Sequence, residues 1–466
     1  MAIAGCMHRT YRPVDALRRQ RSWEDLTGIG SYGGMVNDIP FGFGLPDPDD
    51  AESSSGTPEN PFAAMFGGAD SADIGAALQR FGQLLSTSSG PVHWQLAHDT
   101  ARQLVAADGD PSITAAERSA VAEAVAIAEV WLDEATTLPS TGITPQAWSR
   151  AEWIDQTLPR WKALILPLAE RMAQASTEAM PQQLPEEMRA MAGPLLGMMG
   201  QMSGVMFGGQ VGQGLGTLAQ EVLTSTDVGV PLAPAGTVAL VPRNVAEFGA
   251  GLEIPEDQVR IYLAVRECAH VRLFQHAPWL SSRIESAVAD YARGISVDMS
   301  GIEQALGGID PSRPEAMSEL MSSGVFEPPT TPEQQAALDR LEHLLALVEG
   351  WVDAVTSAAC ETRLPSASAL RETMRRRRAS GGPAEHTFET LVGLNLRPRR
   401  LRDASMLWSA VAEHRSTAER DHIWTHPDLL PDAADLDDPT AFATGSATSD
   451  WDISTLTDPT DEPPAP

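Results

Sequence analysis

The residues of this 466-residue chain that could do chemistry lie together in one predicted helix, residues 256–275. With a period of 3.6 residues, Val259, Leu263, Glu267 and His270 share one face of that helix. A carboxylate in an apolar stripe is costly unless it is paired or bound to a metal. The placement therefore indicates either an ordinary Glu–His polar pair or a functional site.

The same helix contains a close match to the zinc-binding motif H-E-x-x-H, in the five residues Arg266-Glu-Cys-Ala-His270. In that motif two histidines one turn apart bind Zn²⁺, and the glutamate polarises the metal-bound water. The glutamate and the second histidine are present here, but the first histidine is Arg266. A guanidinium stays protonated and has no lone pair for a metal, so the motif is incomplete.

A further ligand of such sites is often a glutamate on a later helix, and Glu349 lies in the predicted helix 331–358. Asp353 follows one turn later, and both could equally form a solvated acidic flank. Gly350, next to Glu349, weakens a helix by about 1 kcal/mol relative to alanine. Its use there predicts close packing or access at this point.

The elements that must position these residues are mostly helices. Helical periodicity dominates from residue 71 onward, including a helix over 146–176 that Pro159 and Pro167 could interrupt. Thr237–Val241 is the clearest strand. We predict a mainly α fold with a small β element and long loops. The uncharged, glycine-rich stretch 190–220 is predicted as a closely packed soluble helix pair rather than a membrane span.

The composition changes along the chain in a way that predicts four regions. These are a disordered or extended N-terminal region (1–70), a helical part (71–255), a helical core that carries the site (256–430) and an acidic disordered tail (431–466).

The charge balance excludes some partners. There are 33 Lys and Arg against 63 Asp and Glu, a formal charge of −30, which argues against binding nucleic acid or an anionic membrane. Three widely spaced cysteines imply no disulfide framework and fit a cytoplasmic protein. Cys268 as a nucleophile has no identifiable partner base.

Two arginine runs, at 371–378 and 397–402, stand out in this acidic chain. They could form solvated helix faces, pair internally with acidic residues, or recognise an anionic partner. No nucleic-acid-binding module accompanies them.

With these motifs in order along the chain, the sequence resembles the zincin-like metallopeptidases of actinobacteria, including the hydrolase branch of that family. The resemblance implies a mainly helical zincin fold, with Glu267 as general base and His270 and Glu349 as zinc ligands. Arg266 stands where the metal-binding members have histidine. The blocks that carry the resemblance are Asp38–Gly44, Gly90–Ala97, Trp131–Thr136, Trp148–Trp153, Arg266–Phe274, Pro278–Leu280, Glu349–Asp353 and Trp424–Pro431.

Catalytic zinc normally has three protein ligands and one water. With Arg266 in the motif, only His270 and Glu349 remain, unless Asp353 or His276 moves in. Our first hypothesis is therefore an impaired enzyme, or pseudoenzyme, in which Arg266 pairs with Glu349 or Asp353 and the residual cleft binds a peptide or protein.

The alternative hypothesis is an active zinc-dependent metalloprotease or hydrolase with an unusual site. Glu267 would then move the proton of a metal-activated water. The sequence predicts neither the substrate nor the oligomeric state.

Overall fold

The computed structural model describes residues 90–140, 142–178, 186–295, 331–379 and 398–445. All of them belong to one compact unit, residues 39–466, and the remaining unit, residues 1–38, lies outside the described residues. The predicted N-terminal region 1–70 lies outside the described residues as well, because these begin at residue 90. The described part is mainly helical with one small sheet, which confirms the predicted fold class.

The elements follow one another as a long series of helices with two short strands. In chain order they are α3 (Trp94–Ala107), α4 (Ala115–Ala135), β1 (Thr144–Ala147), α5 (Arg150–Glu178), α6 (Glu186–Glu221), β2 (Thr237–Leu240), α7 (Pro242–Gly249), α8 (Glu256–His276), α9 (Pro278–Arg293), α12 (Pro332–Cys360), α13 (Ala367–Ala379), α15 (Leu401–His414), α16 (Thr417–His422), the 3₁₀ turns η3 (Ile423–Thr425) and η4 (Pro427–Leu429), α17 (Ala433–Asp437) and α18 (Pro439–Thr444).

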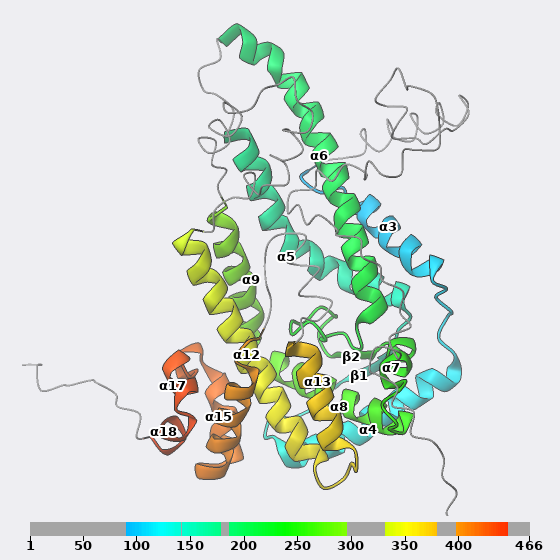
Figure 1. The fold of residues 1–466 in the computed structure, drawn as a ribbon, viewed down its shortest axis with the longest axis vertical. Coiled ribbons are helices and arrows are strands. Elements are labelled where there is room, and N and C mark those ends of the chain that lie inside the picture. Colours follow the sequence, from blue (N-terminus) through cyan, green and yellow to red (C-terminus); the bar gives the residue numbers. More distant parts are fainter. Residues whose placement is uncertain (1–89, 141, 179–185, 296–330, 380–397, 446–466) are drawn as a thin grey trace, which may run out of the picture. The chain divides into compact units, whose positions relative to one another are not determined.

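The helix α8 is the centre of the fold. It packs against α4, α12, α13 and β2 (Figure 1), and every residue from Tyr262 to Phe274 is buried. A helix buried all round must be apolar or must pair its polar side chains. Because α8 carries Arg266, Glu267, His270 and Arg272 in this stretch, the surrounding elements have to supply their partners.

The small sheet lies beside α8. Strands β1 and β2 pair in parallel, with Thr144 opposite Thr237 and Ala147 opposite Leu240. On the other side of β2, the segment after α6 runs antiparallel, with a bridge between Thr224 and Leu240. This pairing fixes the loop that continues to Ser225, which contacts α8. The predicted strand at Thr237–Val241 is thus observed one residue shorter, and β1 was not predicted.

The glycine-rich stretch forms the long helix α6, which packs closely along α3 (Figure 1). A Cβ placed on Gly208 would lie 2.7 Å from the carbonyl oxygen of His93, and one on Gly212 would lie 2.5 Å from that of Ala97. Only glycine permits this approach of two helix backbones. The predicted close packing is therefore observed, although as one continuous helix against α3. None of the helices in the described ranges has the length and apolarity that a bilayer crossing requires.

The predicted helix over 146–176 is observed as α5, and it continues through Pro159 and Pro167 without a break. Its buried face includes Trp153, Trp161 and Leu168, and it packs against α3, α6 and α9. Tertiary burial here outweighs the cost of two prolines in a helix interior.

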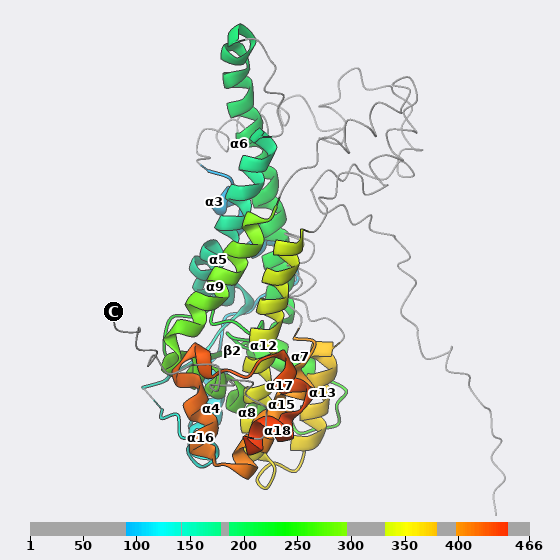
Figure 2. The ribbon, with the colours of Figure 1, turned by 90° about the vertical axis from the view of Figure 1, so that its left-hand side faces the viewer.

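The chain after residue 430 also differs from its prediction. Where we predicted the start of a disordered tail, α17 and α18 form and pack on α15 (Figure 2). Asp432 and Asp438 cap the two helices, and Leu436 and Ala443 are buried. The acidic residues thus serve as helix caps rather than as a sign of disorder. Residues 446–466 lie outside the described residues.

Candidate functional site

The site is built around Glu349, which α12 presents to α8. The two helices pack directly against each other. Arg266 Nη2 donates to Glu349 Oε2 at 2.8 Å, and His270 Nε2 lies 3.2 Å from Glu349 Oε1. Residues 266 and 270 are one turn apart, so both reach the same carboxylate. The structure therefore brings together three of the residues that the sequence singled out.

A fourth group, Arg378, completes this cluster from the last turn of α13. Its Nη2 donates to Glu349 Oε1 at 2.7 Å. We name Arg266, His270, Glu349 and Arg378 the Glu349 cluster. All four side chains are buried, with Glu349 1% exposed. One carboxylate thus lies between two guanidinium groups and an imidazole.

The charges of the cluster stabilise ionised Glu349. Burial by itself would raise the pKa of this carboxyl group, but Arg378, His270 and Arg266 together hold its pKa well below the usual range. The ionised Glu349 in turn raises the pKa of Arg266 in spite of burial. These side chains thus form a buried ion-pair network around Glu349.

Both ring nitrogens of His270 face hydrogen-bond acceptors. Its Nδ1 lies 3.0 Å from the carbonyl oxygen of Arg266, and its Nε2 faces Glu349 Oε1. A ring nitrogen can hydrogen-bond to either acceptor only by donating a proton. A metal ligand needs the Nε2 lone pair instead.

We tested whether these residues fit zinc. Two ligands of one tetrahedral zinc lie roughly 3.4 Å apart for metal–ligand distances near 2.1 Å, and the 3.2 Å between His270 Nε2 and Glu349 Oε1 is close to that separation. The other observations do not fit. Guanidinium groups donate to both oxygens of Glu349, and the described residues contain no group of three His, Cys, Asp or Glu side chains that could hold a metal ion.

Glu267 lies on α8 beside the Glu349 cluster but has its own partners. Its carboxylate is fully buried and accepts hydrogen bonds from the hydroxyls of Ser225 and Thr226 and, at 3.3 Å, from the backbone N–H of Thr226. These donors take the place of water around the buried Glu267 carboxylate. Sequence reasoning missed both hydroxyl residues, because nothing in their local sequence shows that the β2 pairing carries them to α8.

Asp353 lies one turn along α12 from Glu349, in a separate cluster. It accepts from Arg371 at 2.7 and 3.0 Å, from Arg375 at 2.6 Å and from the Ser405 hydroxyl at 2.7 Å. We name these four residues the Asp353 cluster. Burial would raise the pKa of Asp353, but its arginine and serine partners lower it overall. Asp353 therefore has partners other than the zinc-site residues.

Two other candidates also have different surroundings. His276 bonds the carbonyl oxygen of Arg272 through Nδ1 at 2.8 Å, at the end of α8. Cys268 is fully buried, and burial together with the nearby Glu129 raises the pKa of its thiol well above the usual range. A thiol in that state is a poor nucleophile.

The first arginine run turns out to face inward. On α13, Arg371, Arg375 and Arg378 contact the two carboxylates of α12, and Arg377 bonds Asp227 at 3.0 Å. Of the three explanations left open, internal pairing holds for these four, while Arg376 is exposed and pairs with Glu372 on its own helix. Within the second run, Arg399, Arg400 and Arg402 make ion pairs at the surface.

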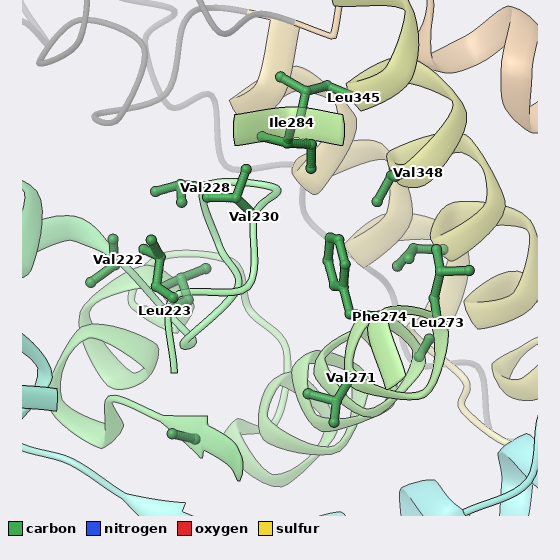
Figure 3. Close-up of a cluster of buried hydrophobic side chains, with 14 of the residues drawn as sticks. Val222, Leu223, Val228, Val230, Val271, Leu273, Phe274, Ile284, Leu345 and Val348 are labelled. Atoms are coloured by element: carbon green, nitrogen blue, oxygen red, sulfur yellow. The ribbon is translucent and has the colours of Figure 1, made fainter. Parts of the chain in front are cut away.

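Two glycines near the cluster allow close packing. A Cβ on Gly350 would lie 2.5 Å from the Cβ of Ala404 on α15, so of the two predicted reasons for this glycine, close packing is observed. Gly229, with φ of +82°, brings its loop against the site, and a Cβ there would lie 3.3 Å from Glu349 Oε1. Val228 and Val230 of this loop belong to the same buried cluster as Phe274 of α8 (Figure 3).

A pocket of about 650 Å³ has Ser225 and Thr226 among its lining residues. Both residues are buried, and their hydroxyls donate to the Glu267 carboxylate. The remaining walls of the pocket come from α5, the loop 231–236, α8 and α9.

Comparison with known proteins identifies the family. A family model described as zincin-like metallopeptidase matches residues 92–443, about three quarters of the chain. The fold is similar to that of a solved structure from Chloroflexus aurantiacus, described as a putative hydrolase with a novel fold. The TM-score is 0.53 at 21% identity, covering 76% of this chain and 98% of the other. No curated protein matches the chain. Since the family model covers most of the sequence, and the fold agrees with it, this chain belongs to the zincin-like metallopeptidase family.

Proposed function

We propose that this chain is a zincin-like protein in which an arginine–carboxylate network replaces the catalytic zinc, and that it works by binding a ligand rather than by hydrolysing one. The observation that carries the proposal is the pair of guanidinium groups on Glu349, one on each carboxylate oxygen. They supply positive charge at the place where family members would hold a cation.

The charge of the cluster supports this proposal. A zinc ion would bring two positive charges to Glu349, and Arg266 and Arg378 together bring the same number. Binding zinc as well would place a dication beside two buried guanidiniums, and like charges at close range in a poorly solvated site repel strongly. The network therefore competes with zinc.

The surroundings of Glu267 also support it. A general base must reach the proton that it removes, within about 3 Å or through one water. The Glu267 carboxylate is fully buried, and its described hydrogen bonds all come from Ser225 and Thr226. These contacts suit a structural role, in which the Glu267 carboxylate fixes Ser225 and Thr226 to α8, better than the role of general base.

The competing proposal is an active zinc-dependent hydrolase with Glu267 as general base. It is favoured by the spacing of His270 and Glu349, which suits two ligands of one ion. This reading requires Arg266 and Arg378 to leave Glu349 and a third ligand to take their place.

Zinc content and peptide hydrolysis separate the two proposals. Protein purified without chelators should hold far less than one zinc per chain, and should cleave no member of a peptide library above a Glu267→Gln control. Stoichiometric zinc that is lost in His270→Ala, with cleavage abolished by Glu267→Gln and by chelator, would establish the hydrolase. Glu372→Gln, on an exposed face of α13, is the matched carboxylate control.

A further inference from the structure

One face of α6 consists of glycines, and α3 covers only part of this face. The glycines recur every three or four residues along α6 and therefore lie on the same side of the helix. Where α3 packs, a Cβ on Gly204 would lie 3.0 Å from the carbonyl oxygen of Gly90, and one on Gly216 would lie 2.8 Å from the Leu104 side chain. We name this face the glycine groove, made up of Gly197, Gly200, Gly204, Gly208, Gly212 and Gly216.

The N-terminal end of the glycine groove is uncovered in the described part of the chain. Gly197 and Gly200 are exposed, and no atom of another described element lies within 4 Å of a Cβ placed on either of them. The N-terminal half of α6 extends past the start of α3 (Figure 1). A surface that holds a helix backbone along one half thus continues without a partner along the other.

The described chain begins at the boundary between the covered and the uncovered part of the groove. The backbone N–H of His93 donates to the carbonyl oxygen of Gly204 at 2.9 Å, and Gly90 lies against the same glycine. The segment that precedes Gly90 must therefore leave from this point of α6. Ser86 precedes Gly90 by four residues, so the two residues lie within roughly 14 Å of each other.

That segment, residues 71–86, has the sequence of an amphipathic helix. Its large apolar residues recur at intervals of four, three and four, which places them on one stripe of a helix. They are Ile74, Leu78, Phe81 and Leu85. The two charged residues of the segment, Asp73 and Arg80, fall outside this stripe. A helix this short is only marginally stable alone in water, so the apolar stripe needs a partner surface.

The contacts of α3 define a register that suits the segment. His93 lies opposite Gly208, an offset of 115 residues that the next contact, one turn along, repeats. At the same offset Leu85 falls opposite Gly200. A large side chain then meets a position where α6 has none, which is the complementarity that close helix packing requires.

We infer that residues 71–86 form a helix that docks in the uncovered end of the glycine groove, in line with α3 and with Leu85 against Gly200. The docked helix continues the packing of α3 on α6 toward the start of α6. The inference goes beyond the proposed function and does not depend on it, because neither zinc nor the Glu349 cluster is involved.

Disulfide trapping in the full-length protein tests this contact. The variant carries Cys6→Ser, Leu85→Cys and Gly200→Cys, and the two remaining cysteines are buried. Under mild oxidation a disulfide within one chain should form at least about tenfold faster than in a control with Met202→Cys in place of Gly200→Cys. Met202 is exposed at nearly the same height of α6 but points away from the groove.

Three outcomes of the trapping experiment would overturn the inference. Equal rates in the two variants would mean that the segment does not select the glycine groove, and no disulfide in either would mean that it does not dock on α6. A disulfide between two chains would assign the groove to a second copy of the protein.

Hydrogen exchange tests the helix itself. In the wild type, the backbone amides of residues 71–86 should exchange at least about tenfold more slowly than those of an unstructured peptide. Gly200→Gln fills the groove and should remove this protection, while the amides of α3 keep theirs. Gly209→Gln is the matched control, because it replaces a glycine on the opposite side of the same helix, where a Cβ meets no neighbour in the described part of the chain. Unprotected amides at 71–86 in the wild type, or protection that survives Gly200→Gln, would contradict the inference.

Discussion

Two buried carboxylates one turn apart on α12 pair with arginines in similar ways, although only Glu349 was predicted from the family resemblance as a metal ligand. Glu349 and Asp353 are each 1% exposed, and each accepts hydrogen bonds from two arginines. The Asp353 cluster adds a serine hydroxyl, and the Glu349 cluster adds a histidine. The comparison indicates that Glu349, the predicted metal ligand, is held by the same kind of arginine pairing as the neighbouring Asp353.

The two clusters differ in how deeply their cations are buried. Arg266 and Arg378 are 6% and 8% exposed, whereas Arg371 and Arg375 are 28% and 19% exposed. Water can therefore partly solvate the arginines of the Asp353 cluster if their carboxylate is removed. The cations around Glu349 have no such alternative, because α8, α12 and α13 enclose them. Loss of the carboxylate should thus cost more at Glu349 than at Asp353.

The largest expected effect is that of Glu349→Gln. This change leaves two buried guanidiniums without a counter-charge, and breaking a buried ion pair in this way costs about 3–5 kcal/mol. Denaturant unfolding should show a loss of this size in the free energy of unfolding. A loss below about 1 kcal/mol would mean that the Glu349 cluster is not a structural network.

Asp353→Asn should have a smaller effect, about 2 kcal/mol, since a hydrogen bond to a charged group is worth about 1.5–3 kcal/mol and the arginines here regain some hydration. The same unfolding measurement applies. If Asp353→Asn destabilised the protein more than Glu349→Gln, the difference in burial would not control the two clusters.

These two predictions depend on arginine and carboxylate partners that could be predicted from the sequence only in part. The helix that carries Glu267 and His270, the helix that carries Glu349 and the pairing of Arg266 with a carboxylate all follow from periodicity and charge. Arg378 could not be predicted, since its run of arginines matches an exposed basic helix equally well. Only the docking of α13 shows which arginines face inward. Ser225 and Thr226 likewise depend on the antiparallel contact with β2, which has no local sequence signal.

The pH dependence of stability tests the ionised state of Glu349. The folded-state pKa of Glu349 lies below its ordinary value of 4.5, so its contribution to stability is present above pH 4.5 and is lost as the pH falls. Between pH 7 and pH 3 this loss amounts to roughly 2 kcal/mol for Glu349. Unfolding curves of Glu349→Gln should therefore fall less steeply with acid than those of the wild type. Parallel curves for the two proteins would contradict a lowered pKa.

The smallest expected effect is that of Ser405→Ala in the Asp353 cluster. The serine hydroxyl donates to Asp353 at 2.7 Å, and both arginines remain to satisfy the carboxylate. A loss of about 1 kcal/mol in the free energy of unfolding is expected. Ser409→Ala is the matched control, because its hydroxyl bonds only a carbonyl oxygen of its own helix. Equal losses in the two variants would remove Ser405 from the cluster.

The most direct test of the central claim is to remove the two guanidiniums and measure zinc. The double variant Arg266→His with Arg378→Gln restores a second histidine one turn from His270 and frees Glu349 Oε1. After equilibration with zinc and removal of the free metal, elemental analysis should find close to one zinc per chain in this variant and far less in the wild type. Adding His270→Ala should abolish the gain. Stoichiometric zinc in the wild type, or a folded double variant that binds no more zinc than the wild type, would contradict the replacement of the metal by Arg266 and Arg378.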